Sequence, residues 1–367
     1  MKISIERATL FRALAHANSI VEKRNTIPIL SNVMLKAEAG KLTIIATDLD
    51  MQITEIVDAV VDQAGSTTVS SSTLFEIVRK LSGGAQVQLA TDGAQLTVTS
   101  GRSRFKLNAL PTDDFPLIGA GEMSNRLDVT AAQISEMISD TRFAMSTEET
   151  RYYLNGIFMH VSNGMLKAAA TDGHRLALSG IAYEGESIPD IIVPRKAVAE
   201  VQKLLGEVEG DIEVQLSGSK IRFDMGNVVL TSKLIDGTFP DYNRVIPTSN
   251  DKVMTVDVKA LNSAADRMSI MSAEKTRAIT MTLKRDLVEL VVTSPENGTA
   301  NEEVAAECRH DLRIGFNSRY LQDILAQIET EEVEFHFGEP SSPVLIKQKE
   351  PSNNQREKTW VLMPMRT

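Results

Sequence analysis

The sequence has one cysteine, Cys308, one tryptophan, and only 5% aromatic residues. A single cysteine excludes a disulfide within the chain, so we expect a protein of a reducing compartment and place it in the cytoplasm. No apolar run reaches the length of a signal peptide or of a membrane-spanning helix. The remaining composition, 42% apolar and 24% charged over 367 residues, is typical of a globular chain with two or three domains.

Motifs of common enzymes and metal sites are also missing. The pair Gly83-Gly84 lacks the lysine and hydroxyl residue of a phosphate-binding loop, and no Gly-x-Ser-x-Gly elbow occurs. None of the five histidines stands at metal-ligand spacing from another histidine or from Cys308. The sequence therefore predicts no metal and no cofactor. Ser, His and Asp side chains from distant segments could still meet in space, so an enzyme stays an open alternative.

The formal net charge is −10, which argues against a nucleic-acid partner unless the two signs lie on different faces. The basic clusters are Lys23-Arg24, Arg102/Arg104/Lys106 and Arg195-Lys196. Acidic runs lie elsewhere, for example Glu148-Glu149. Taken singly, each cluster is better explained as an ordinary solvated surface, so charge alone does not indicate a nucleic-acid partner.

The chain repeats itself with a period of about 120 residues. A period of two followed by a period near 3.6 predicts a strand and then an amphipathic helix. This pattern starts at Ile3, Leu127 and Met254, and again at Val69, Val193 and Phe316. Alternating segments with turn residues at their centres then predict hairpins at 85–100, 211–226 and 331–348. We expect Thr9 and Thr130 to help cap their helices.

The repeat predicts three domains, 1–124, 125–250 and 251–367. The proposed boundaries follow segments rich in Gly, Ser and Asn or marked by Pro, as linkers often are. The third copy departs from the other two, with "VTSPENG" at 292–298 in place of Thr-Asp and a polar insertion at 348–358 that we interpret as a hairpin loop.

Asp172, His174 and Arg175 could form a catalytic cluster or could belong to a turn. Thr47-Asp48 precedes Thr171-Asp172 by 124 positions. A duplicated Thr-Asp at the end of a strand favours the turn, because Asp can accept from the backbone two residues on. We therefore interpret Asp48 and Asp172 as structural, whereas His174 and Arg175 have no counterpart in the first copy.

Five segments together resemble one family. They are "SGRSRF" (100–105), "RYYLNG" (151–156), "ATDGHRLA" (170–177), "SKLIDGTFPDYNRVIP" (232–247) and "VLMPMR" (361–366). They resemble the bacterial DNA polymerase III beta subunits, the sliding clamps. The resemblance implies an α+β fold of three clamp domains, each with two helices and two small antiparallel sheets. It further implies a head-to-tail homodimer that closes into a six-domain ring.

The implied function is that of a processivity factor without catalytic activity. The ring encircles double-stranded DNA without sequence preference, because phosphate contacts permit sliding whereas base contacts would arrest it. The implied protein partners are the DNA polymerase III alpha subunit, the clamp loader, and other polymerases and repair proteins, which bring short clamp-binding motifs. No membrane partner is implied.

The resemblance also assigns residues. The DNA contacts are Arg24, Arg102, Tyr152, Tyr153 and Lys196, while Ser72 and Glu148 stand where relatives can carry Arg and Gln. The first subsite of a peptide-binding groove comprises Arg151, Leu154, Thr171, Gly173, His174, Arg175, Leu176, Pro240, Arg244, Val245, Val361 and Met363. The second comprises Tyr153, Asn317, Tyr320, Val344, Leu362, Pro364, Met365 and Arg366. The subunit interface joins Phe105 and Leu107 to Ile270 and Met271 of a partner.

Two alternatives remain at this point. One is an enzyme that uses Asp172, His174 and Arg175 on a repeated scaffold. The other is a monomeric three-domain adaptor that binds peptides but no DNA. Phe105, Leu107, Ile270 and Met271 could equally be ordinary core residues, because alternation alone does not separate core from interface.

Overall fold

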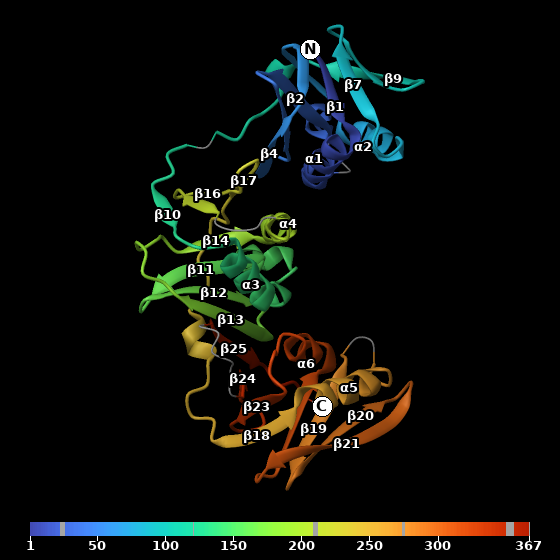
Figure 1. Cartoon of the computed structure of the whole chain (residues 1–367). Coiled ribbons are helices and arrows are strands. Elements are labelled where there is room, and N and C mark those ends of the chain that lie inside the picture. Colours follow the sequence, from blue (N-terminus) through green and yellow to red (C-terminus); the bar gives the residue numbers. More distant parts are fainter. Residues whose placement is uncertain (23–25, 120, 208–211, 274–275, 350–355, 367) are drawn as a thin grey trace. The chain divides into compact units, whose positions relative to one another are not determined.

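The computed structural model describes residues 1–22, 26–119, 121–207, 212–273, 276–349 and 356–366. The chain divides into two compact units, and each contains one antiparallel sheet (Figure 1). The first unit comprises Met1–Ile134, Gly185–Ile188 and Lys196–Leu234. The second comprises Ser135–Glu184, Pro189–Arg195 and Ile235–Thr367. The three domain boundaries predicted from the repeat stay a prediction.

The helices of the described residues follow the predicted repeat, two to each third of the chain. They are α1 (Arg7–Ile20), α2 (Ser71–Lys80), α3 (Ala131–Thr141), α4 (Arg195–Leu205), α5 (Val258–Ser269) and α6 (Ser318–Leu325). Each begins within a few residues of a strand's end, as the change of period predicts. In the first unit α1 lies against α2, and in the second α5 lies against α6 (Figure 1). None of the described helices is long and apolar enough to cross a membrane.

The sheet of the first unit joins strands of the first and second repeats. From edge to edge it runs β10 (Asn125–Leu127), β15 (Glu213–Leu216), β16 (Lys220–Asp224), β17 (Val228–Lys233), β4 (Met51–Asp58), β3 (Lys41–Thr47), β2 (Asn32–Glu38), β6 (Gly65–Ser70), β9 (Ser103–Leu110), β8 (Gln95–Ser100), β7 (Gln86–Thr91), β1 (Lys2–Glu6) and β5 (Val60–Gln63). The junction between repeats is the antiparallel ladder of β17 with β4.

The sheet of the second unit joins strands of the second and third repeats. It runs β14 (Ile191–Pro194), β11 (Gly156–Ser162), β12 (Met165–Thr171), β13 (Arg175–Ala182), β25 (Arg356–Leu362), β24 (Val344–Gln348), β23 (Glu332–Phe337), β18 (Lys252–Asp257), β21 (Gly298–Cys308), β20 (Leu287–Ser294), β19 (Ala278–Lys284) and β22 (Leu312–Asn317). Here β13 pairs with β25, from Arg175 opposite Leu362 to Ile181 opposite Arg356.

The predicted hairpins are confirmed. β7 pairs with β8, β15 with β16, and β23 with β24, each antiparallel. The polar insertion predicted as a hairpin loop falls mostly on residues 350–355, which lie outside the described residues; the flanking strands β24 and β25 pair antiparallel.

Helix starts show which capping predictions hold. Thr130 accepts from the backbone N–H of Gln133 at 3.2 Å, and the Gln133 side chain accepts from the N–H of Thr130 at 2.9 Å, a reciprocal capping box. Thr9 was expected to cap α1 and does not. It lies inside the helix, and its hydroxyl donates to the carboxylate of Glu6 instead.

The repeated Thr-Asp segments are turns, as predicted. Asp48 Oδ1 accepts from the N–H groups of Asp50 and Met51, and Asp172 Oδ1 accepts from those of His174 and Arg175. In the third copy the hydroxyl of Ser294 accepts from two backbone N–H groups of its own turn, so a serine replaces the missing Thr-Asp.

Candidate functional site

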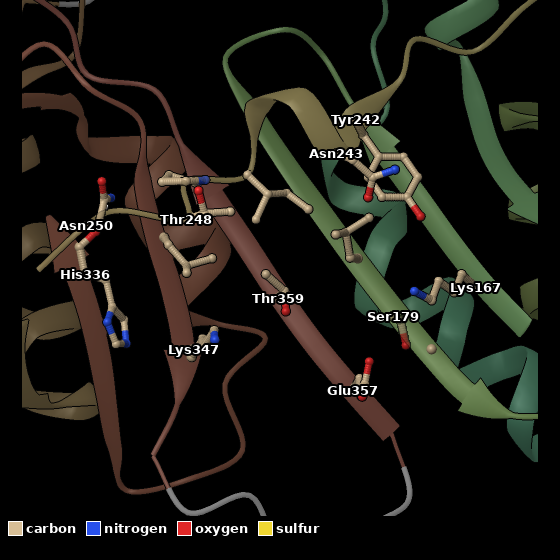
Figure 2. A pocket seen from close by; sticks show the side chains of 15 residues that line it. Lys167, Ser179, Tyr242, Asn243, Thr248, Asn250, His336, Lys347, Glu357 and Thr359 are labelled. Atoms are coloured by element: carbon tan, nitrogen blue, oxygen red, sulfur yellow. Dashed lines mark hydrogen bonds between the residues drawn. The ribbon is translucent and has the colours of Figure 1, made fainter. Parts of the chain in front are cut away.

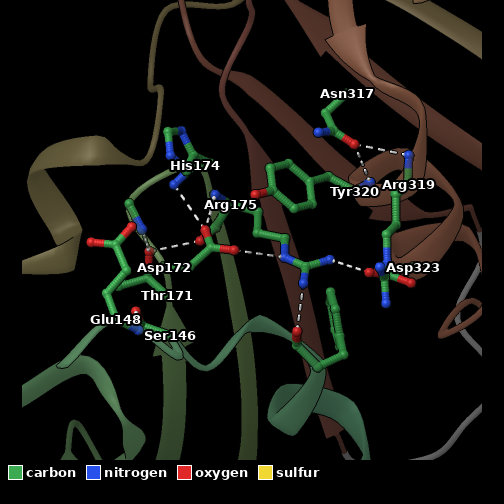
Figure 3. A network of polar contacts seen from close by, with 12 residues as sticks. Ser146, Glu148, Thr171, Asp172, His174, Arg175, Asn317, Arg319, Tyr320 and Asp323 are labelled. Atoms are coloured by element: carbon green, nitrogen blue, oxygen red, sulfur yellow. Dashed lines mark hydrogen bonds and ion pairs between the residues drawn. The ribbon is translucent and has the colours of Figure 1, made fainter. Parts of the chain in front are cut away.

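Arg175 begins β13 at the turn after β12, and its side chain is only 9% exposed. Its guanidinium donates to three acceptors: Asp172 Oδ2 at 3.1 Å, Asp323 Oδ2 at 2.5 Å, and the carbonyl oxygen of Phe143 at 2.7 Å. It also lies over the ring of Tyr320, 4.5 Å from the centroid (Figure 3). A buried guanidinium needs such partners, because an unpaired charge away from water is costly.

Next to Arg175 lies an apolar pocket of about 240 Å³. It is lined by Arg151, Tyr153, Leu154, Thr171, Gly173, Arg175, Leu176, Pro240, Asp241, Tyr242, Val245, Val361 and Met363. Leu154, Leu176, Tyr242 and Val361 belong to one buried cluster, so the pocket walls are also core side chains. Four separate segments contribute: the 3₁₀ helices η4 (Glu149–Leu154) and η5 (Tyr242–Val245), the turn before β13, and the end of β25.

Gly173 lies in one wall of the apolar pocket, close to the guanidinium of Arg151. Its φ is +87°, and Leu49 at the equivalent position of the first repeat has φ +77°, so this conformation can carry a side chain at a cost. A Cβ at Gly173, however, would lie 2.5 Å from Nη1 of Arg151. A side chain at this position would therefore require the end of the Arg151 side chain to shift, in addition to the backbone strain.

Arg151 is held in place by Glu148. The guanidinium donates to both carboxylate oxygens, at 2.9 and 2.7 Å, and this pairing lowers the pKa of Glu148 and raises that of Arg151. The carboxylate of Glu148 is therefore bound to a residue of the pocket wall.

Tyr242 separates the apolar pocket from a second hollow of about 560 Å³, because it lines both. The second hollow lies over β13, β24 and β25 and is bordered by polar residues that include Lys167, Lys347 and Glu357 (Figure 2). The Tyr242 hydroxyl is 2.7 Å from Nε2 of His160. Burial raises the pKa of Tyr242 and lowers that of His160, so both side chains are held in their neutral forms near neutral pH.

The other residues predicted for the groove fall into four groups. His174 and Tyr320 stack with ring centroids 6.0 Å apart, and Asn317 caps α6 by accepting from the N–H groups of Arg319 and Tyr320 (Figure 3). Three others, Pro364, Met365 and Arg366, line a separate open hollow of about 1130 Å³. Val344 and Leu362 are fully buried opposite each other in β24 and β25, and Arg244 is exposed and pairs with Asp241.

Models of three domains of one protein family match the chain in order. The N-terminal, central and C-terminal domains of the DNA polymerase III beta subunit match residues 1–119, 128–241 and 243–366. The chain belongs to the DNA polymerase III beta subunit family.

Relatives in this family match over the whole chain. The beta sliding clamp of Caulobacter vibrioides (strain NA1000 / CB15N) is 46% identical over 375 aligned residues that cover all of both chains. Two solved structures each give a TM-score of 0.96 over all of this chain. One is the C. crescentus beta sliding clamp with polyethylene glycol bound, 45% identical and 99% covered. The other is the Bartonella birtlesii sliding clamp (DNA polymerase III subunit beta) bound to griselimycin, 42% identical and fully covered.

Family membership confirms the resemblance inferred from the five segments and the α+β fold of three clamp domains. The enzyme alternative is not favoured by the geometry either. Asp172 is committed to two backbone N–H groups and to Arg175, and no hydrogen bond among the described residues joins it to the imidazole of His174.

The residues that the family resemblance assigns to DNA are placed as follows. Arg24 lies outside the described residues. Arg102 is exposed at the turn between β8 and β9, and Tyr152 and Tyr153 lie edge to face in η4 with centroids 5.8 Å apart. The ammonium of Lys196 forms ion pairs with Asp48 and Glu22, so its charge is partly compensated within the chain.

The four residues assigned to the subunit interface of the family differ in exposure. Ile270 is 76% exposed directly after α5, and Met271 beside it is half-buried. Phe105 is partly exposed on β9 and borders a hollow of about 470 Å³ formed with α2, whereas Leu107 is buried. The exposed Ile270 and Phe105 are not core residues of a single chain, contrary to the alternative that all four are.

Sequence reasoning missed several residues of this region. Asp241 and Tyr242 line the apolar pocket and lie within the segment "SKLIDGTFPDYNRVIP", so that segment carried the signal. Asp323 and Phe143 were missed because they contact Arg175 only through the tertiary fold, 148 and 32 residues away in sequence.

Proposed function

We propose that this chain is a DNA polymerase processivity factor: two copies form a ring around double-stranded DNA, and the ring tethers the replicative polymerase through a peptide-binding groove. The observation that carries the proposal is the ordered match of all three beta-subunit domains on one chain, with 46% identity to a named sliding clamp over the full length of both. The protein acts without catalysis and without a cofactor, in the cytoplasm.

Closure of the ring uses two strand edges. Over residues 103–108, β9 pairs with β8 on one side, and no described strand pairs with its other side there. Likewise β21 pairs with β20 over 298–305 and leaves its other edge open among the described residues. The β9 edge carries Arg104 and Lys106, and the β21 edge carries Glu302 and Glu303. Opposite charge and open edges favour head-to-tail pairing of β9 with β21 of a second copy.

The apolar patches flank these edges. Met271 lies beside the start of β21, because a Cβ at Gly298 would lie 3.8 Å from its Cε. Phe105 lies on β9 itself. Ile270 and Met271 of one copy would therefore meet Phe105 and Leu107 of the next wherever the two strands pair. Burying exposed apolar side chains at such a contact supplies most of the binding free energy.

Within the ring, DNA is held by scattered contacts and by topology. The proposed contacts are Arg24, Arg102, Tyr152, Tyr153 and Lys196, and phosphate contacts of this kind carry no sequence preference. The net charge of −10 limits stray binding to other polyanions. Retention then depends on encirclement more than on affinity.

Partner proteins dock in the groove next to Arg175. The apolar pocket, with Met363 at its edge, takes the apolar side chains of a short Gln- and Leu/Phe-rich motif. The thioethers of Met363 and Met365 adapt to different partners, which include the polymerase III alpha subunit, the clamp loader, and other polymerases and repair proteins.

The decisive experiment compares retention on circular and linear DNA. The protein is loaded by a clamp loader onto a nicked plasmid, separated from free protein, and the plasmid is then cut once. We expect stable retention on the circle and rapid loss after cutting. Equal loss from both forms contradicts encirclement, and binding that survives cutting indicates ordinary DNA affinity.

A further inference from the structure

The side chain of Asp323 is used for a single contact. It lies in α6 one helical turn after Tyr320, is 33% exposed, and pairs with Nη1 of Arg175 at 2.5 Å. No other hydrogen bond or ion pair of this carboxylate occurs among the described residues. Asp172, by contrast, also builds the turn through two backbone N–H groups. Asp323 can therefore be changed without dismantling the turn.

Arg175 connects two segments that are distant in sequence. On one side it is bound to the turn and to the carbonyl of Phe143 in η3 (Arg142–Ala144). On the other side it meets α6 twice, through the carboxylate of Asp323 and the ring of Tyr320 (Figure 3). Residues three apart lie on one face of a helix, so one guanidinium reaches both. His174 stacks on the same Tyr320 ring and adds a third contact between turn and helix.

Each of the three guanidinium nitrogens of Arg175 already donates to an acceptor of the protein, so the group is not wholly available to a ligand. Its three acceptors and two aromatic neighbours instead fix where α6 lies relative to the turn. The groove proposed above has one half beside the turn, the apolar pocket, and another half that includes Tyr320 of α6 and Asn317, the residue that caps this helix. The spacing of the two halves then depends on the contact between Arg175 and α6.

We propose that Asp323 is a positioning residue of the peptide groove: by holding Arg175 it sets the distance between the apolar pocket and the α6 half. This inference rests on the proposed function. Asp323 touches no peptide itself. A ligand that fills only the apolar pocket is insensitive to Asp323, whereas a ligand that spans both halves depends on it.

The test uses two synthetic peptides and fluorescence anisotropy with the full-length protein. The long peptide has about eight residues, is rich in Gln and Leu/Phe, and spans roughly 26–29 Å when extended; the short one is its apolar end of about three residues. For Asp323→Asn we expect roughly tenfold weaker binding of the long peptide, the scale of one charged hydrogen bond, and no more than about a twofold change for the short one.

A matched control and a rescue separate positioning from general damage. Asp266→Asn removes the same charge from a carboxylate that accepts from Gln322 of α6, away from the turn, and should bind both peptides as the native protein does. Asp323→Glu keeps the charge and should recover most of the lost affinity. Emission of the single tryptophan, Trp360, which is fully buried in β25, should be the same in all variants.

Several outcomes would overturn the proposal. Native affinity of Asp323→Asn for the long peptide would do so, as would equal weakening of both peptides. If Asp323→Asn does not fold, Asp323→Glu decides: a folded Asp323→Glu that binds the long peptide no better than the short one contradicts the assignment. Failure of the native protein to bind either peptide would contradict the proposed groove itself, a result distinct from a defect confined to Asp323.

Discussion

At the scale of single residues, the Thr-Asp turn binds a positively charged side chain in both the first and the second repeat. Asp48 Oδ1 accepts two backbone N–H groups while its other oxygen pairs with Lys196. Asp172 divides its oxygens in the same way between the backbone and Arg175. A carboxylate fixed by its own turn loses little further entropy when it binds a cation, which makes it a good anchor between segments.

The apolar pocket gives the first residue-scale prediction. Met363→Ala and Leu154→Ala each remove apolar wall, so each should weaken binding of a polymerase-derived peptide by roughly 1–3 kcal/mol, as truncation of an anchor pocket does. Calorimetric titration measures the affinity, and thermal unfolding serves as the control. Leu154 is buried and will also lower stability, so half-buried Met363 gives the cleaner measurement. Unchanged affinity in both variants would exclude this pocket as the docking site.

The side chain of His16 gives the second residue-scale prediction. Its Nδ1 lies 2.8 Å from Glu55 and its Nε2 lies 3.2 Å from Glu207, and the hydrogen bond to Glu55 raises the pKa of His16 above its ordinary 6.5. Because the folded pKa is raised, the charged imidazole stabilises the fold fully below pH 6.5, and this contribution is lost as pH rises through the folded pKa.

The corresponding measurement is the melting temperature of native protein and His16→Gln at about pH 6 and about pH 9. At the lower pH the native protein should have a higher melting temperature than the variant. This difference in melting temperature should shrink at the higher pH. His310→Gln, at an exposed histidine, is the matched control and should show the same small gap at both. A gap for His16→Gln that widens with pH would show that the neutral ring is the stabilising form.

At the scale of elements, charged side chains accompany the β13–β25 ladder. Asp140 of α3 accepts from Ser179 of β13 and pairs with Lys358 of β25 at 2.9 Å. Arg356 of the same strand pairs with Glu136 at 3.0 Å, and Lys358 also pairs with Glu329, which lowers the pKa of Glu329. Asp140, Arg356 and Lys358 are all buried side chains. Breaking such a pair leaves a charge without its partner away from water.

Asp140→Asn should therefore lower the free energy of unfolding by roughly 1–3 kcal/mol, less than removal of the sole partner of a buried charge costs, because Glu329 still pairs with Lys358 and Glu136 with Arg356. Urea unfolding followed by Trp360 emission reports on this ladder, because Trp360 lies opposite Ala177 across it. Asp286→Asn is the control, since its pair with Arg285 is 3.7 Å long and exposed, and it should cost less than about 1 kcal/mol. A similar loss of unfolding free energy in both variants would show that Asp140 stabilises the fold no more than an exposed carboxylate does.

At the scale of the whole molecule, the sign and position of charge favour assembly. Basic side chains lie along β9 and acidic side chains lie along β21, although the chain is acidic as a whole. A closed ring would cover both open edges, and an uncovered edge is a site for unwanted pairing. The monomeric adaptor alternative leaves both edges and the exposed Ile270 unexplained.

Ile270→Asp tests the assembly. The native protein should have about twice its 40.2 kDa chain mass in solution, and the variant should approach the chain mass, because a carboxylate in an apolar contact is costly to desolvate. Light scattering after size exclusion gives the mass. Leu117→Asp introduces the same charge at another exposed apolar residue, 57% exposed, and should stay dimeric. A native mass equal to one chain would rule out the ring.

The sequence by itself determined the elements and the turns. Strand and helix periods, the capping box at Thr130 and the Thr-Asp turns all depend on residues within a few positions of one another, so their pattern survives without the fold. The five quoted segments also identified the family. Thr9 failed as a cap because the helix begins two residues before it, a boundary that periodicity does not fix.

Only the tertiary structure decided which partners these elements have. It made β13 the neighbour of β25, joined Arg175 to Asp323 and Lys358 to Asp140, and used Asp48 for Lys196. These pairs are separated by well over a hundred residues, and no period or motif in one segment specifies its partner in another. Their choice follows from which surfaces pack together, because burial of each charge is tolerated only where the fold brings its counter-charge.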